Sequence, residues 1–95
     1  MLIDKPIEKN KITTMKLATG EELIAKILED TEHTMTLAKP LSIIMSDKGL
    51  AMIPYMLSVS VDDTVVLQKR HCICTAKPVL EVEKHYLQVT TGISL

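Results

Sequence analysis

The residues most able to do chemistry in this chain are two cysteines and three histidines, and their spacing limits what that chemistry is. Cys72 and Cys74 lie two residues apart in the run HCIC. On a strand, residues at this spacing point to the same side, and one intervening residue is too few for a disulfide. A zinc site would need His71 as well, but adjacent strand residues point to opposite faces and the sequence has no second pair of ligands. We therefore expect buried, reduced thiols in an intracellular setting, with no metal and no cofactor.

Motifs for catalysis are missing from the sequence. It has no glycine-rich phosphate loop, no nucleophile elbow and no pair of carboxylates placed for acid and base work. His33, His71 and His85 lie on three separate predicted elements. The sequence therefore predicts a binding or structural protein without catalytic residues, and not an enzyme.

Net charge restricts the partners. The 95 residues carry a net charge of −1, so no overall basic field draws nucleic acid to the chain from a distance. A polyanion would therefore have to be held locally, by short groups of polar and charged residues. Residues of these types also occur in turns and on solvated loops for local reasons alone. Both interpretations stay open at the level of residue types.

The centre of the fold is predicted to be residues 15–45, in which two turn signals separate three apolar runs. The turn at 18–21 has a glycine where a tight hairpin needs a positive φ, and the turn at 29–32 is wholly polar. In the third run the large apolar residues other than Ile44 occupy odd positions, which is the period of a strand. Lys39-Pro40 interrupts this run without shifting its phase. Because proline cannot donate to a ladder, this point should be a bulge, a bend or a free edge.

The rest of the chain supplies the outer elements. Residues 1–10 are expected to form an arm. A fourth strand is predicted at 50–57, with Pro54 favouring an edge or a bulge, and a fifth at 64–75, broken near Gln68-Lys69. The last segment changes to helical spacing, which predicts a helix over residues 78–91. Residues 11–77 and this helix then form one mostly β domain.

Several predicted strands are apolar on both faces, notably residues 23–28 and 50–57. A small domain cannot cover both faces of such strands by itself. Self-association would cover the second face. No stretch approaches the roughly 20 apolar residues of a membrane span, so we expect a soluble protein that is not exported.

The order of these elements resembles the Sm/LSm superfamily, which includes bacterial Hfq. The resemblance covers about residues 12–76. The positions that match the first motif of the family are Gly20, Ala25, Asp30, His33, Thr34 and Leu37. Ala25 stands where the family has a second glycine, and Thr34 where it has an asparagine. The AMIPYM run of the fourth strand and the terminal helix with its tyrosine look like small Sm-like proteins encoded by tailed phages.

The resemblance implies a five-stranded, strongly bent antiparallel small barrel with a C-terminal α-helix. It also implies a homo-oligomeric ring in which strand four of one subunit pairs with strand five of the next. Such rings bind single-stranded RNA at the pore. Asp30 would orient the loop, Thr34 would bind a base edge, His33 would stack on a base, and Lys69 with Arg70 would contact phosphates. The alternative is a ring that binds protein, as an assembly component in phage infection. In either case we expect a cytoplasmic protein, which means the host cytoplasm if a phage encodes it.

Overall fold

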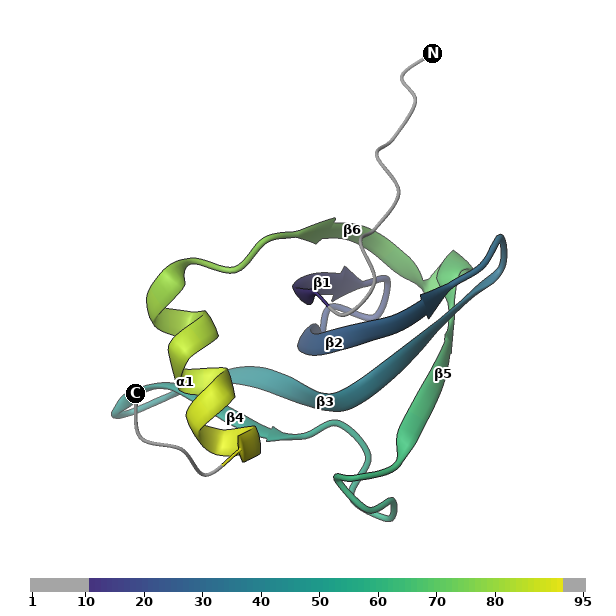
Figure 1. Ribbon diagram of the computed structural model, residues 1–95. Coiled ribbons are helices and arrows are strands. Elements are labelled where there is room, and N and C mark those ends of the chain that lie inside the picture. Colours follow the sequence, from purple (N-terminus) through teal and green to yellow (C-terminus); the bar gives the residue numbers. More distant parts are fainter. Residues whose placement is uncertain (1–10, 92–95) are drawn as a thin grey trace.

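The computed structural model describes residues 11–91, in which six strands and a turn of 3₁₀ helix precede one α-helix (Figure 1). The predicted arm at residues 1–10 lies outside these residues. The elements are β1 (Ile12–Leu17), β2 (Glu22–Asp30), β3 (Thr34–Ser46), β4 (Gly49–Pro54), β5 (Thr64–Gln68), η1 (Lys69–His71), β6 (Cys72–Ala76) and α1 (Leu80–Thr91). The mostly β architecture and the C-terminal helix are thereby confirmed.

Local residue chemistry explains the hairpins. Gly20 and Gly49 have φ values of 100° and 106°, which a residue with a Cβ atom rarely adopts. Gly20 lies in the tight connection between β1 and β2, and Gly49 begins β4 directly after the tight connection from β3. Pro54 ends β4 at the margin of the sheet, where its missing N–H leaves no gap in a ladder, as predicted.

The strands form one antiparallel sheet with the order β4-β3-β2-β1-β6, and β5 pairs with the first part of β3. A closed barrel, which the resemblance implied, is not observed. Among residues 11–91, β6 pairs with β1 alone, so no ladder joins it to β4 or β5. The 3₁₀ turn η1 separates β5, which pairs with β3, from β6, which pairs with β1 at the opposite end of the sheet. In Figure 1 the helix α1 stands on the open side, between the end of β6 and the β3–β4 hairpin.

The bend in β3 is a bulge at Lys39-Pro40. Ile24 of β2 faces Leu41, whereas Lys26 faces Ala38, so one residue of β2 opposes two residues of β3. Lys39 has a φ of 49° at this point. The predicted interruption is confirmed, but the prediction that its phase is kept is wrong. The extra residue moves the odd positions of β3 from one face of the sheet to the other.

Two apolar clusters show this change of face. On the concave face, Met35 and Leu37 pack with Leu23, Ile27 and Leu67. Beyond the bulge, Leu41 packs on the other face with Ile24 and with Tyr86 of α1. Full burial of an aliphatic side chain of this size contributes about 1.5–3 kcal/mol. Because of the bulge, β3 supplies apolar side chains both to the concave core and to the face on which α1 packs.

Candidate nucleic-acid interface

The turn between β2 and β3 is closed by two threonines. The Thr34 N–H donates to Thr31 Oγ1 at 3.0 Å, and the Thr31 N–H donates to the Thr34 carbonyl at 2.9 Å. The two hydroxyls also lie 2.8 Å apart. This arrangement holds Glu32 and His33 at the tip, where both side chains are exposed. The Thr34 hydroxyl, predicted to bind a base edge, is thus already engaged within the turn.

The 3₁₀ turn η1 lies against this turn and against the first hairpin. The Lys69 N–H donates to the His33 carbonyl at 2.8 Å, and the Ala18 N–H donates to the His71 carbonyl at 2.7 Å. The pairing of Thr34 with Gln68 brings the start of β3 next to the end of β5. All five predicted site residues are therefore gathered at one margin of the sheet, although they come from two segments far apart in sequence.

Lys69 has a structural partner within this cluster. Its ammonium forms an ion pair with Asp30 Oδ1 and donates to the Thr31 carbonyl at 2.7 Å. The two side chains are largely covered, with 32% of Lys69 and 14% of Asp30 exposed. Asp30 Oδ1 is buried and has no hydrogen bond within residues 11–91, so the Lys69 ammonium is its sole compensation there. Lys69 therefore offers little free charge to a phosphate.

The outward groups of the cluster are His33, Arg70 and His71. His33 Nε2 lies 3.2 Å from Glu32 Oε1, and both side chains are more than 80% exposed. Such an exposed pair is weak and leaves the ring of His33 available for another contact. Glu29 and Glu32 make the surroundings acidic as well as basic. The margin thus presents two imidazoles and one guanidinium with mixed charge around them.

The cysteines do not share a face, and this corrects the sequence analysis. Leu17 faces Cys72 while its neighbour Lys16 faces Cys74, so the register shifts by one residue in β6 at Ile73. Cys72 packs beside the concave core and Cys74 is exposed. Burial, and secondarily the nearby Cys74, raises the pKa of the Cys72 thiol. Within residues 11–91, no three His, Cys, Asp or Glu side chains are grouped as metal ligands.

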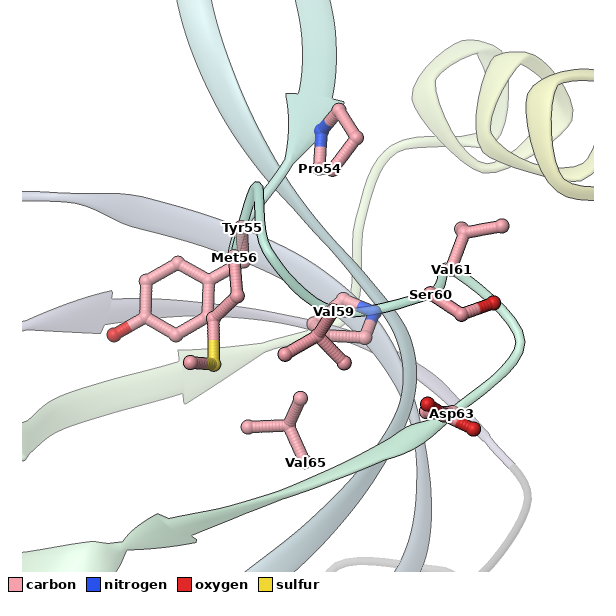
Figure 2. A pocket seen from close by; sticks show the side chains of 9 residues that line it. Pro54, Tyr55, Met56, Val59, Ser60, Val61, Asp63 and Val65 are labelled. Carbon is pink, nitrogen blue, oxygen red and sulfur yellow. The ribbon is translucent and has the colours of Figure 1, made fainter.

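A small hollow lies away from this margin, beneath the chain that joins β4 to β5. Figure 2 shows Tyr55, Met56, Val59 and Val65 gathered around it. Its volume of about 10 Å³ is at the lower limit for a single water molecule, so it is a packing space and not a ligand site.

Sequence reasoning missed Thr31 and His71. Thr31 closes the turn on Thr34, and the three-residue spacing of two threonines in a polar turn was the available signal. His71 follows directly on Arg70 and shares its exposure.

No known family model matches this chain, and no curated protein shows significant sequence similarity to it. Fold and geometry are therefore the basis for any functional argument: an antiparallel sheet with one C-terminal helix and a polar loop cluster at its margin. Among residues 11–91, no helix is long and apolar enough to cross a membrane.

Proposed function

We propose that this protein forms an Sm-like homo-oligomeric ring that binds single-stranded RNA where the β2–β3 turn meets η1. The observation that carries the proposal is the fixed juxtaposition of these two segments through the hydrogen bond from Lys69 N–H to the His33 carbonyl, 2.8 Å long. It places the exposed His33 ring and the exposed Arg70 on one margin. Proteins that bind single-stranded nucleic acid combine a ring that stacks on a base with a cationic group that contacts phosphate.

Self-association is supported by the margins of the sheet. β4 and β6 end the path of strands, and exposed apolar residues lie on both: Ile53 is 42% exposed and Ile73 is 66% exposed. An open edge with apolar side chains is a template for another strand. Pairing of the β4 or β5 edge of one copy with the β6 edge of the next would use both margins and repeat the loop cluster around an axis.

Repetition of the cluster compensates for its modest charge. Within residues 11–91, one copy carries Arg70 as a cation without an ion pair at this margin, because Lys69 is paired with Asp30. Several copies held together raise the effective concentration of the remaining sites once one is occupied. Binding is then moderate, local and sensitive to salt, in keeping with a net charge of −1 per chain.

A protein-binding ring, such as an assembly component in phage infection, is the second candidate. It is favoured by the acidic residues around the cluster, Glu29 and Glu32, which repel phosphate. It is also favoured by Leu57, whose side chain is 85% exposed. The two candidates share the assembly and differ in what the exposed surface binds.

The deciding experiment is binding of oligo-U and oligo-A to the purified chain over a salt series. We expect Arg70→Ala to weaken binding of both oligonucleotides and to lower the salt slope by about one phosphate contact. We expect His33→Ala to cost about 1 kcal/mol of binding energy through loss of a stacked base. Lys77→Ala, which removes an exposed lysine outside the cluster, is the matched control and should leave binding unchanged. If neither oligonucleotide binds at low salt, or if the control behaves like Arg70→Ala, RNA binding at this cluster is wrong.

A further inference from the structure

A groove of about 300 Å³ lies beside α1 on the face of the sheet that carries the helix. Ile12, Leu28 and Ala38 line it from β1, β2 and β3, and Leu87 lines it from the helix. Among residues 11–91, Lys26 and Lys39 are its charged residues, and no acidic residue lines it. Within residues 11–91, Lys26 has no ion-pair partner, while the Lys39 ammonium donates to the Thr90 carbonyl at 3.0 Å. The groove is therefore apolar and basic, and suits an occupant that is apolar and acidic.

The loop at residues 55–63 has the opposite chemistry. Leu57 is its most exposed apolar side chain, with 85% of its surface accessible. Asp62 and Asp63 follow a few residues later and are both exposed. An apolar group followed by two carboxylates is complementary to the groove in both respects.

This loop is held in a defined shape. The Asp63 N–H donates to the Ser60 carbonyl at 3.0 Å, and the Asp62 N–H donates to Ser60 Oγ at 3.2 Å. Val59 turns inward toward Val65, as Figure 2 shows. A loop that is already ordered loses less conformational entropy on binding than a free one. Leu57 is thus an exposed side chain on a loop whose backbone is held by hydrogen bonds.

Loop and groove lie on opposite faces of the sheet. The loop packs over Val65, which faces Leu37 on the concave side. The groove is lined by Lys26 and Ala38, a register pair on the strands that flank the bulge, together with Leu87 of α1 on the other side. The loop of one molecule cannot reach its own groove across the sheet. A contact between them has to join two copies, and it has to be heterologous, with different surfaces on each side.

We propose that the 55–63 loop of one copy docks in the α1 groove of a second copy, with Leu57 in the groove and Asp62 and Asp63 facing Lys26 and Lys39. The contact rests on the proposed self-association and adds to the pairing of sheet edges. Because it is directional, it orders the copies head to tail, which is the arrangement that closes into a ring. It also accounts for the exposure of a leucine at the tip of a well-ordered loop.

The test uses complementation between two variants of the full chain, measured by sedimentation velocity. Leu57→Asp removes the apolar group of the loop and leaves the groove intact. Lys26→Glu reverses a charge in the groove and leaves the loop intact. Both positions are exposed, so both variants should fold, which circular dichroism checks. Each variant alone should need at least tenfold higher concentration than the unaltered chain to assemble. An equimolar mixture should form one-to-one pairs, because the intact groove of the first accepts the intact loop of the second.

The control is Val79→Asp, an exposed apolar position outside loop and groove, which should assemble as the unaltered chain does. If Leu57→Asp and Lys26→Glu also assemble normally while the β4 variant Ile53→Lys does not, the docking contact is wrong and the proposed sheet-edge assembly stands. If the mixture shows no pairs although each variant is impaired, the contact does not join loop to groove. If the unaltered chain is a monomer at micromolar concentration, docking and self-association both fail.

Discussion

At the scale of single residues, Lys69 and Arg70 are adjacent in sequence but have different environments. Lys69 lies over a carboxylate that is 14% exposed and over the Thr31 carbonyl, whereas Arg70 faces solvent. Removing a charge from a covered pair leaves its partner without compensation, which costs more than removing an exposed charge. The first lysine therefore stabilises the turn, and the arginine remains for a ligand.

A double-mutant cycle checks this division. We expect Lys69→Met to lower the free energy of unfolding by about 1–2 kcal/mol, since it leaves the Asp30 carboxylate covered and unpaired. Asp30→Asn should cost less, and the double variant should cost less than the sum, with a coupling energy of about 1 kcal/mol. Urea denaturation supplies the measurement, and Lys77→Met is the control for losing an exposed lysine. A loss for Lys69→Met no larger than for Lys77→Met would mean that the ion pair is not structural.

At the scale of elements, Tyr86 joins the helix to the bulge of β3. Its hydroxyl donates to the Lys39 carbonyl at 2.9 Å and lies 3.2 Å from the Ala38 carbonyl, and the Lys26 backbone hydrogen-bonds to it as well. These are the backbone groups on either side of the point where the ladder between β2 and β3 is interrupted. A side chain from α1 thus occupies the gap that the bulge leaves. In addition, the Lys39 ammonium donates a hydrogen bond to the Thr90 carbonyl of the helix. Helix and bulge stabilise each other.

The alkaline stability of the protein should report this contact. Burial raises the pKa of Tyr86 to about 12 from 10.0, with the Lys26 hydrogen bond opposing. Between these values the folded state keeps the Tyr86 hydroxyl proton, whereas the unfolded state loses it. The contribution of Tyr86 to the free energy of unfolding is therefore complete below pH 10 and is lost as pH rises toward 12. A shift of this size corresponds to about 2–3 kcal/mol.

The measurement compares the unaltered chain with Tyr86→Phe in chemical denaturation from pH 8 to 12. At pH 8 the variant should be less stable by about 1–2 kcal/mol, because buried backbone groups lose a partner. That difference should shrink steadily above pH 10. Tyr55→Phe is the control and should keep most of the alkaline loss. A difference that stays constant with pH would contradict a protonated Tyr86 as the source of stability.

At the scale of the whole molecule, the sheet leaves its margins open. β4, β5 and β6 each have one strand partner within residues 11–91, and the β3–β4 hairpin extends beyond β2. Exposed apolar side chains lie on both faces of that hairpin: Ile44 and Ile53 on one, Met45 and Leu50 on the other. Ile43 and Met52 at the base of the hairpin pack against the cluster of Leu41 and Tyr86, but the part beyond them exposes its apolar side chains. A two-stranded hairpin without such cover is marginally stable in water. A second copy would supply the missing layer.

Placing a charge on the β4 margin should therefore prevent assembly. We expect Ile53→Lys to reduce the mass measured by light scattering to that of one chain at micromolar concentration, because lysine on an edge strand opposes pairing with another strand. Val89→Lys, on the exposed side of α1, should leave the mass unchanged. An unaltered mass for Ile53→Lys would exclude β4 from the interface. Comparison of RNA binding by the resulting monomer with that of the assembly would then show how far repetition of the site contributes.

The sequence by itself determined the features that depend on neighbouring residues. Strand period, the glycine hairpins, the break before Lys69, the helix after Pro78 and the interruption at Lys39-Pro40 all follow from local backbone preferences. The segments of the candidate site were also predictable, since turns collect polar residues. The placement of Asp30, His33 and Arg70 at one margin was implied by the resemblance to Sm-like proteins and not by any local pattern.

Tertiary structure alone decided which face each apolar residue occupies and which charges are free. One inserted residue at Lys39-Pro40 reverses the face of Leu41, and one at Ile73 separates Cys72 from Cys74, because strand side chains alternate and a single-residue shift inverts them. Ion pairing of Lys69 with Asp30 depends on a contact across 39 positions of sequence, which local pattern does not specify. Closure of the sheet likewise depends on long-range pairing, and β6 pairs with β1 alone in the described part of the chain. These properties depend on strand register and on contacts between residues far apart in sequence, and local backbone preferences encode neither.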